Sequence, residues 1–347
     1  LPQQNVFDRA FPISVTETVL SGLQGHKRFR SRYTAEDCRR ALQLLATLSE
    51  KDLRDTPSAV LADHLYNTDK DADAATVLAP RAANEMLTAY RSFLQREIPA
   101  ADAAAFRRDP QRLAAWCRDS LTLRPELCTV STTISPEGVW RSRTADKPSR
   151  KIFFVAAARS LGIPAWIDPV TGNLFYRHAG KDVPVDFESA NDRQLETGRL
   201  KLRYEPIPRL DDPEYFRHFT LSRFDGQSFA LLNYPDFEPW SARFDTPTDL
   251  ETGYYMLATG SRLADGSVLA NVSFLNIGPN RTTETDLPMR DNSEAVRVIG
   301  SFNSESKFID ARTGRETSVL LTAGRGYFVV GLVGVGQEPT DHALKDI

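Results

Sequence analysis

Three cysteines are the strongest nucleophiles in the 347-residue sequence. Cys38, Cys117 and Cys128 form no Cys-x-x-Cys pair. Structural zinc sites and disulfide frameworks need closely spaced or evenly paired cysteines. We therefore expect no metal site and no disulfide framework, although one disulfide bond remains open, and nothing in the sequence indicates a cofactor. The default expectation for such isolated thiols is burial rather than catalysis.

Carboxylates offer a second chemistry. Asp182, Asp186 and Glu188 occupy alternate positions of a strand-like segment, and alternate residues of a strand share one face. Two carboxyl groups on one face can act as general acid and general base in a hydrolase. The same pattern is typical of the polar edge of an amphipathic strand, so both interpretations stay open.

Helical patterns dominate the first half of the chain. Residues 34–37 form a capping-box-like start, and an apolar stripe follows. Further helices, each with proline in or near its first turn, are predicted over 57–65, 80–94 and 110–121. A strongly apolar helix over 150–158 ends near Gly162, with Pro164 beyond it. This helix is predicted to be buried.

Strand patterns follow that helix. Segments 165–167 and 174–176 read as short strands joined by a turn that begins at Asp168, and residues 183–187 read as a further hairpin strand. From residue 216 onward, short apolar runs separated by Gly, Asn and Asp indicate an antiparallel β-sandwich. Its strands are predicted over 228–234, 253–259, 267–276, 295–299, 317–321 and 327–333.

The apolar helix and its following turn resemble the central helix of bacterial transglutaminase-like domains. The resemblance rests on the sequence from Ile152 to Ala165. In that family the helix begins at a nucleophilic cysteine about fifteen residues before the turn glycine, and a downstream histidine activates it. The resemblance implies a papain-like α+β fold in which the helix dipole lowers the pKa of the thiol. Lys147 occupies the cysteine position here, so the resemblance implies that acyl transfer is lost.

Three other residues bear on that active site. His178 stands roughly where the family has its histidine, but it also fits an exposed hairpin tip. Asp168 shares the family's Asp-Pro dipeptide but precedes the histidine position, which favours a turn role. Ser149 is the next candidate nucleophile, and we expect it to cap the helix instead.

The segment from Ile134 to Arg143 resembles a subset of bacterial cell-envelope proteins with a cysteine-free version of this helix. That resemblance implies the periplasm or cell envelope of a Gram-negative bacterium. Residues 338–344 resemble a lead into a further domain, such as a thioredoxin-like one. Both ends of the sequence look cut, so we expect a targeting segment to have been removed.

Together these patterns predict an α+β protein with five parts. They are a helical lead-in over 1–79, a transglutaminase-like core over 80–195, a linker rich in charge and proline over 196–214, the β-sandwich over 215–335, and a linker to a further domain over 336–347.

The preferred function is a non-catalytic module that binds a peptide, glycan or protein in the cleft left by the lost active site. The residues expected around that cleft are Trp140, Arg141, Arg143, Lys147, Trp166, Asp168, Tyr176 and His178. The alternative is that these aromatic residues belong to the core. A third interpretation makes the β-sandwich the binding part, with Trp240, Tyr254 and Tyr255 stacking on sugar rings.

Composition excludes two classes of partner. A net charge of -3 and a pI near 6.0 provide no basic face of the kind that nucleic-acid binding usually needs. No apolar run approaches the roughly 18 to 20 residues of a membrane-spanning helix, so we expect no membrane span.

Overall fold

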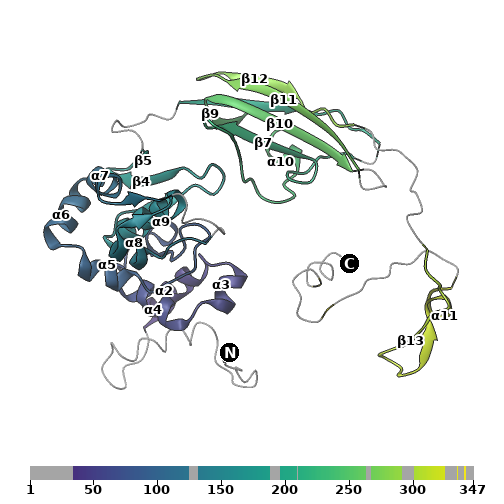
Figure 1. Cartoon of the computed structure of the whole chain (residues 1–347), viewed down its shortest axis with the longest axis horizontal. Coiled ribbons are helices and arrows are strands. Elements are labelled where there is room, and N and C mark those ends of the chain that lie inside the picture. The colour runs from purple at the N-terminus through teal and green to yellow at the C-terminus, as the bar shows by residue number, and fades with distance from the viewer. Residues whose placement is uncertain are drawn as a thin grey trace. The chain divides into compact units, whose positions relative to one another are not determined.

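The computed structural model describes residues 34–124, 132–187, 196–208, 210–262, 267–290 and 301–324, together with 334 and 340. The chain forms two compact units: Leu1–Ser261 with Ala270–Asp291, and Arg262–Leu269 with Asn292–Ile347. Helices come first and strands predominate later (Figure 1), which confirms the α+β class. No helix within the described ranges is both long and apolar enough to cross a bilayer.

The helical part of the first unit contains short helices and one π-helical turn. In chain order these are α2 (Ala35–Leu45), α3 (Glu50–Asp55), α4 (Ser58–Tyr66), η2 (Ala74–Leu78), α5 (Arg91–Glu97), α6 (Ala100–Arg108), α7 (Gln111–Asp119), α8 (Pro136–Ser142) and α9 (Lys147–Ser160). Thr34 and Asp37 form a full capping box, as predicted. The helix predicted over 80–94 is wrong up to residue 90. There the Glu85 carboxylate accepts from the N–H groups of Ala82 and Ala83, which favours a turn over a helix.

Helix α9 is the centre of the first hydrophobic core. Phe153, Phe154 and Val155 are completely buried, and apolar residues of α5, α7, β3 and β4 belong to the same core. Burying each phenylalanine contributes on the order of 2 to 3 kcal/mol. The helix begins at Lys147, three residues earlier than predicted, because Asp146 is its cap: its carboxylate accepts from the N–H of Ser149 at 2.8 Å. The prediction that Ser149 is the cap is therefore wrong.

Two buried arginines join the predicted lead-in to this core. The Arg159 guanidinium on α9 donates to the carbonyls of Ala79 at 2.8 Å and Arg81 at 2.7 Å, and the Arg91 guanidinium donates to the carbonyl of Val77 at 2.6 Å. Arg91 also donates to Nδ1 of His64 on α4 at 3.3 Å. Because the bonds to Ala79, Val77 and His64 cross the predicted boundary between residues 79 and 80, the helical lead-in is part of one unit with the core.

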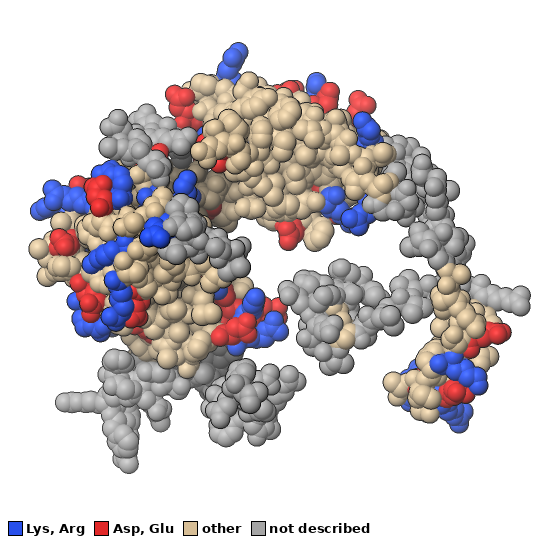
Figure 2. Space-filling model, in the orientation of Figure 1, with Lys and Arg blue, Asp and Glu red and all other residues tan. Residues whose placement is uncertain are grey.

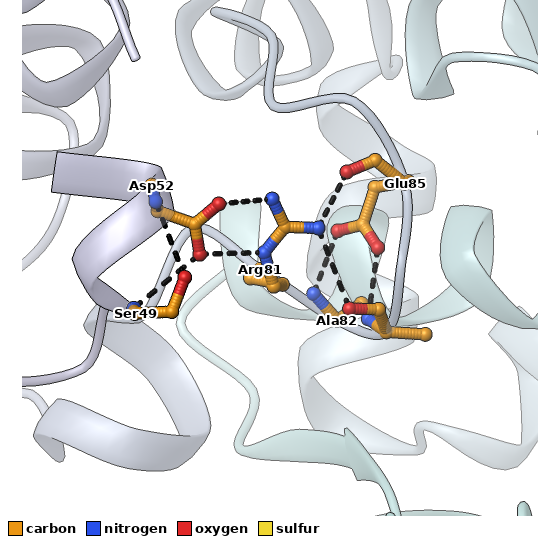
Figure 3. A network of polar contacts seen from close by, with 6 residues as sticks. Ser49, Asp52, Arg81, Ala82 and Glu85 are labelled. Carbon is orange, nitrogen blue, oxygen red and sulfur yellow. Dashed lines mark hydrogen bonds and ion pairs between the residues drawn. The ribbon is translucent and has the colours of Figure 1, made fainter. Parts of the chain in front are cut away.

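An ion pair crosses the same boundary. Arg81 binds the Asp52 carboxylate on α3 through two nitrogens, and its third nitrogen donates to the carbonyl of Glu85 (Figure 3). Asp52 also forms a reciprocal cap with Ser49. The hydrogen bond from Arg81 holds the pKa of Asp52 below its ordinary value. The loop that follows η2 is thus fixed to α3 by charge as well as by packing.

Two small sheets flank α9. The first is the parallel pair β1 (Thr122–Leu123) and β2 (Thr144–Ala145), which leads directly into the Asp146 cap. The second is the antiparallel sheet of β3 (Ala165–Ile167), β4 (Leu174–His178) and β5 (Lys181–Val185), in the order β3-β4-β5. This confirms the predicted hairpin after the apolar helix.

Seven further strands form two larger sheets. They are β6 (Thr197–Arg203), β7 (Phe219–Phe224), β8 (Phe229–Leu231), β9 (Thr248–Glu251), β10 (Gly253–Arg262), β11 (Val268–Ile277) and β12 (Thr282–Asp286), with the short helix α10 (Trp240–Arg243) before β9. The four-stranded sheet has the order β11-β10-β7-β8, and the three-stranded sheet has the order β12-β6-β9. Side chains from both sheets, including Leu202, Leu221 and Leu257, share a second core.

Two predictions about this region need correction. The linker predicted over 196–214 contains β6, the central strand of its sheet. Its basic residues lie on the more exposed face, and they alternate with buried Leu200 and Leu202, so the charge belongs to an amphipathic strand. In addition, β6 and β12 pair in parallel, so the sheets are not wholly antiparallel.

The second unit contains a hairpin of β13 (Lys307–Ile309) and β14 (Glu316–Ser318), followed by α11 (Val319–Ala323). The strand predicted over 317–321 therefore ends at Ser318, whose side chain caps α11 by accepting from the N–H of Leu321. This hairpin belongs to neither larger sheet. The predicted strands over 295–299 and 327–333 lie outside the described residues.

Candidate functional site

The start of α9 presents no thiol and no free hydroxyl in the described structure. Lys147 is exposed at the first helical position. The Ser149 hydroxyl is completely buried; it donates to Asp146 Oδ2 at 3.0 Å and accepts from the N–H of Ile134 at 2.8 Å. A serine whose hydroxyl is bound on both sides by structural partners, without a neighbouring imidazole, cannot be activated for attack.

His178 lies at a tight turn, which confirms the hairpin-tip interpretation. It is the exposed last residue of β4 and pairs with Lys181 across the hairpin. The turn residues Ala179 and Gly180 have φ angles of 50° and 74°, as a type I′ turn requires. No described hydrogen bond or ion pair joins His178 to Lys147. The described contacts therefore do not bring His178 and Lys147 together as a catalytic pair.

Asp168 organises the turn between β3 and β4. Its Oδ1 accepts from the N–H groups of Val170 at 3.2 Å and Thr171 at 2.7 Å, and its own N–H donates to the carbonyl of Asn173 at 2.8 Å. Lys151 on α9 also donates to the carbonyl of Gly172 at 2.6 Å. The carboxylate of Asp168 is therefore used in turn formation, as its position in the sequence predicts.

Trp140 and Arg143 meet at the end of α8. The indole rings of Trp140 and Trp116 are stacked at 5.3 Å with 17° between their planes, and Phe153 lies beneath them in the core. The Arg143 guanidinium lies 3.9 Å from the ring centroid of Trp140 and 4.7 Å from that of Trp116. We call Trp116, Trp140 and Arg143 the tryptophan–arginine platform.

Arg143 has two unusual features. Its φ angle of 54° places a non-glycine residue in the left-handed region, where it ends α8. Its Nη1 atom is buried and has no hydrogen-bond partner in the described structure. Burial also lowers the pKa of the guanidinium. A buried guanidinium nitrogen without an acceptor is costly, and it is suited to an acceptor supplied by a ligand.

The remaining predicted site residues lie elsewhere. Arg141 is exposed, pairs with Glu137 at 2.8 Å and lies over the Phe93 ring. Trp166 stacks on Phe175 of β4 at 5.6 Å. Tyr176 is buried in the first core beside Phe154, and its hydroxyl contacts Gln111 at 3.3 Å. Tyr176 is thus a core residue, and the two predicted tryptophans stand in separate stacks.

The structure describes two of the three carboxylates of the hydrolase interpretation, and the contacts of Asp182 are those of a hairpin edge. Asp182 is exposed, and Arg177 binds both of its oxygens, at 2.6 Å and 3.2 Å. Asp186 follows the end of β5, and Glu188 lies outside the described residues. The Asp182–Arg177 pair is a cross-strand contact on the hairpin, which favours the amphipathic-edge interpretation.

The described cysteines are not arranged for catalysis or metal binding. Cys117 on α7 is completely buried, and burial raises the pKa of its thiol. Cys38 is half-buried on α2, and Cys128 lies outside the described residues. Among the side chains that the structure describes, no three His, Cys, Asp or Glu residues are placed to hold a metal ion.

The aromatic residues of the larger sheets divide into core and surface. Tyr255 is buried, and its hydroxyl donates to the carbonyl of Glu251. Trp240 is half-buried, and its Nε1 donates to the carbonyl of Leu202 at 2.8 Å. Tyr254 is 41% exposed. Only Tyr254, of the three residues considered for sugar stacking, presents its ring to solvent.

Sequence reasoning missed the partners of Tyr254. Its ring stacks on Phe274 of β11 at 5.7 Å, and Phe229 of β8 contacts both rings. Phe224 of β7 adjoins Phe229 at 5.3 Å. The spacing of apolar residues along these strands indicates that both faces of the sheet carry apolar side chains. It does not show which of the two faces is buried.

No family model matches this chain, and neither the curated proteins nor the solved structures include a significant match. The geometry itself supplies two candidate contact surfaces: the tryptophan–arginine platform and the apolar outer face of the four-stranded sheet.

Proposed function

We propose that the chain is a catalytically inactive binding module that uses the tryptophan–arginine platform to bind an acceptor-bearing ligand. The observation that carries this proposal is the buried, unpartnered Nη1 of Arg143. A carboxylate is the best match, because a guanidinium binds it through parallel charge-assisted hydrogen bonds. The ligand is a peptide, glycan or protein that carries such a group.

The stacked indoles preorganise the guanidinium for this contact. Trp116 and Trp140 hold one face of Arg143, so little side-chain freedom remains to be lost when a ligand binds. The left-handed backbone at Arg143 costs about 1 to 2 kcal/mol. Strain of this kind is common at ligand-binding positions, which agrees with the proposed role.

The absence of acyl transfer in this proposal rests on the start of α9. Lys147 stands at the position where the transglutaminase-like resemblance expects a thiolate, and the hydroxyl of Ser149 is bound by Asp146 and Ile134. Neither group provides a nucleophile with an aligned base. Binding without covalent chemistry is therefore the simpler role for this region.

The proposed location is the periplasm or envelope of a Gram-negative bacterium. It rests on the resemblance of residues 134–143 to cell-envelope proteins and on nothing in the fold. Fractionation of the native cells would test it: recovery of the protein in the cytoplasmic fraction would contradict the proposed location without affecting the proposed platform.

The binding proposal is tested with a matched pair of peptides. One is an N-acetylated acidic tetrapeptide with free carboxylates, and the other is the same peptide with every carboxylate amidated. An acidic oligosaccharide and its neutral counterpart make a second pair. Binding is measured by indole N–H shifts in NMR spectra and by tryptophan fluorescence, because the platform contains two of the four tryptophans in the chain.

The matched variants are Arg143→Gln and Arg141→Gln. Arg141 is a nearby exposed arginine that points to Glu137, so it controls for loss of positive charge. We expect the acidic probe of at least one pair to bind saturably, with about a tenfold or greater loss in R143Q and little change in R141Q. Equal binding of acidic and amidated probes, or of wild type and R143Q, would contradict the proposal.

A further inference from the structure

The outer face of the four-stranded sheet is apolar and exposed. Side chains on this face come from all four strands. Those that are large and at least 39% exposed are Phe224, Leu231, Tyr254, Val268, Val272 and Phe274. Figure 2 shows that charged side chains lie mainly at the margin of the surface over β10 and β11. Exposed apolar faces of this kind mark contact sites in folded proteins.

Strand β11 is an edge of this sheet with unusual composition. It is ten residues long, and within the described strands it has β10 as its only neighbour. Its sequence, Val268–Ile277, contains no Lys, Arg, Asp, Glu or Pro. Natural edge strands usually carry charges, proline or bulges that block pairing with another chain. Strand β11 has neither the charged residues nor the proline that would block such pairing.

The backbone of β11 is partly used at its end. The carbonyl of Asn276 accepts from the Thr283 hydroxyl at 3.2 Å, so the strand is engaged by β12 at that point. The stretch that can pair symmetrically about Val272 therefore runs from Leu269 to Leu275. This stretch is long enough for an ordinary strand pair, because strands in sheets are typically about five to six residues long.

Strand β11 is complementary to itself in one antiparallel register. If Val272 lies opposite Val272 of a second copy, Phe274 lies opposite Ala270 and Asn271 lies opposite Ser273. The Phe274 ring of each copy then packs against the Ala270 methyl group of the other copy. Asn271 and Ser273, which are both polar, lie opposite each other. Leu275 meets Leu269 on the inner face. Every opposing pair is matched in size or polarity, and no like charges meet.

We propose that two copies of the chain pair through β11 in this register, with a two-fold axis at Val272. The pairing joins two four-stranded sheets into one continuous sheet and satisfies the outward N–H and C=O groups of both edges. The dimer is isologous, because the same strand serves both partners. This surface is separate from the tryptophan–arginine platform and does not depend on the ligand proposed there.

A second copy fits this edge better than a glycan. Sugar recognition needs several hydrogen-bonding side chains beside the aromatic rings. On the outer face near Tyr254, the neighbouring residues are Phe224, Phe229 and Phe274, and the rings of Tyr254 and Phe274 lie nearly parallel and against each other. An uncharged face also removes the repulsion that would oppose self-association.

The experiment measures mass in solution by sedimentation equilibrium over about 1 to 100 μM chain, the range in which modest interfaces dissociate. Wild type is expected at twice the 38.8 kDa of the chain. In Val272→Lys, two ammonium groups face each other at the axis, and the dimer should be lost. Because Val272 is 49% exposed, the variant should keep its monomer fold, which circular dichroism checks.

Leu231→Lys is the matched control. Leu231 lies on the same outer face but on β8, the opposite edge of the sheet. The variant should remain dimeric if pairing occurs edge to edge. Loss of the dimer in both lysine variants would indicate face-to-face association and overturn the proposed register. A wild-type monomer at every concentration, or a V272K dimer, would overturn the proposal itself.

Cross-linking tests the register independently. V272C should be joined to its copy by a short bismaleimide, because the two positions are opposite each other. V268C should not, because its own copy lies eight residues further along the partner strand, about 27 Å away. The wild-type chain measures the background from its native cysteines. Efficient linkage through V268C, or none through V272C, would exclude this register.

Discussion

Replacement of Arg159 by methionine tests the view that buried arginines hold the N-terminal helices against the core. Methionine keeps much of the length and apolar volume of the side chain but removes every donor. Arg159 is 3% exposed, and its guanidinium donates five hydrogen bonds to main-chain carbonyls. Burial lowers its pKa, and no carboxylate pairs with it in the described structure.

The expected loss can be estimated from those five bonds. The bonds to Ala79 and Ala165 are fully buried, at 2.8 Å and 2.9 Å, and each orphaned carbonyl costs about 1 to 3 kcal/mol. The bonds to Ala75, Thr76 and Arg81 are partly buried, so water can bind these carbonyls in the variant. Losing each of these bonds therefore costs about 0.5 kcal/mol. The sum is about 3.5 to 7.5 kcal/mol, and relief from burying the charge reduces the expected loss to about 4 kcal/mol.

The assay is urea unfolding followed by tryptophan fluorescence. Trp116 and Trp140 pack against the first core, and Trp166 stacks on Phe175 of β4, so their fluorescence reports on this region. Arg107→Met is the control, because Arg107 donates one bond, to the carbonyl of Leu161 at 3.1 Å. We expect R107M to lose less than about 1 kcal/mol. If R159M also loses less than about 1 kcal/mol, the inference that Arg159 anchors the helices is wrong.

Two further predictions concern a buried base and a close backbone contact. Burial lowers the pKa of His64 from 6.5 to about 3, so the unfolded chain takes up the proton first as pH falls. The unfolding free energy should be constant above about pH 6.5 and decline below it, by up to about 1.4 kcal/mol per pH unit, whereas His64→Gln should lack this decline; equal pH slopes in urea titrations would contradict it. A Cβ at Gly198 would lie 2.1 Å from the carbonyl oxygen of Gly278, whereas one at Gly278 would meet only the Arg281 side chain at 3.4 Å. Calorimetry should therefore show a loss of about 2 kcal/mol or more in G198A and a smaller one in G278A, and equal melting temperatures would refute the close-contact argument.

Local patterns predicted the elements that depend on nearby residues. The capping box at Thr34 and the apolar helix α9 were both predicted, because caps and continuous apolar runs are local signals. The turn role of Asp168 was predicted for the same reason. These features need no knowledge of what lies opposite them.

Features set by distant residues were missed. The segment 80–90 has a helical pattern, but the Asp63 carboxylate, from α4, accepts from the N–H of Arg91 where the real helix begins. The linker prediction failed at β6 because charge alternation resembles a linker until Leu200 and Leu202 are known to face a core. In the candidate site, Trp140 and Arg143 are three positions apart and were predicted together. Trp116, which completes the platform, comes from another helix.

The arginine contacts of α9 have a consequence for the order in which the chain acquires structure. Four of the five carbonyls that Arg159 binds lie 78 to 84 residues earlier in the sequence, in η2 and the loop after it. During synthesis at the ribosome these carbonyls emerge well before their donor. The N-terminal helices are therefore synthesised before the hydrogen bonds from Arg159 can stabilise them. A nascent chain that ends before residue 159 should be degraded more readily than one that extends past β3.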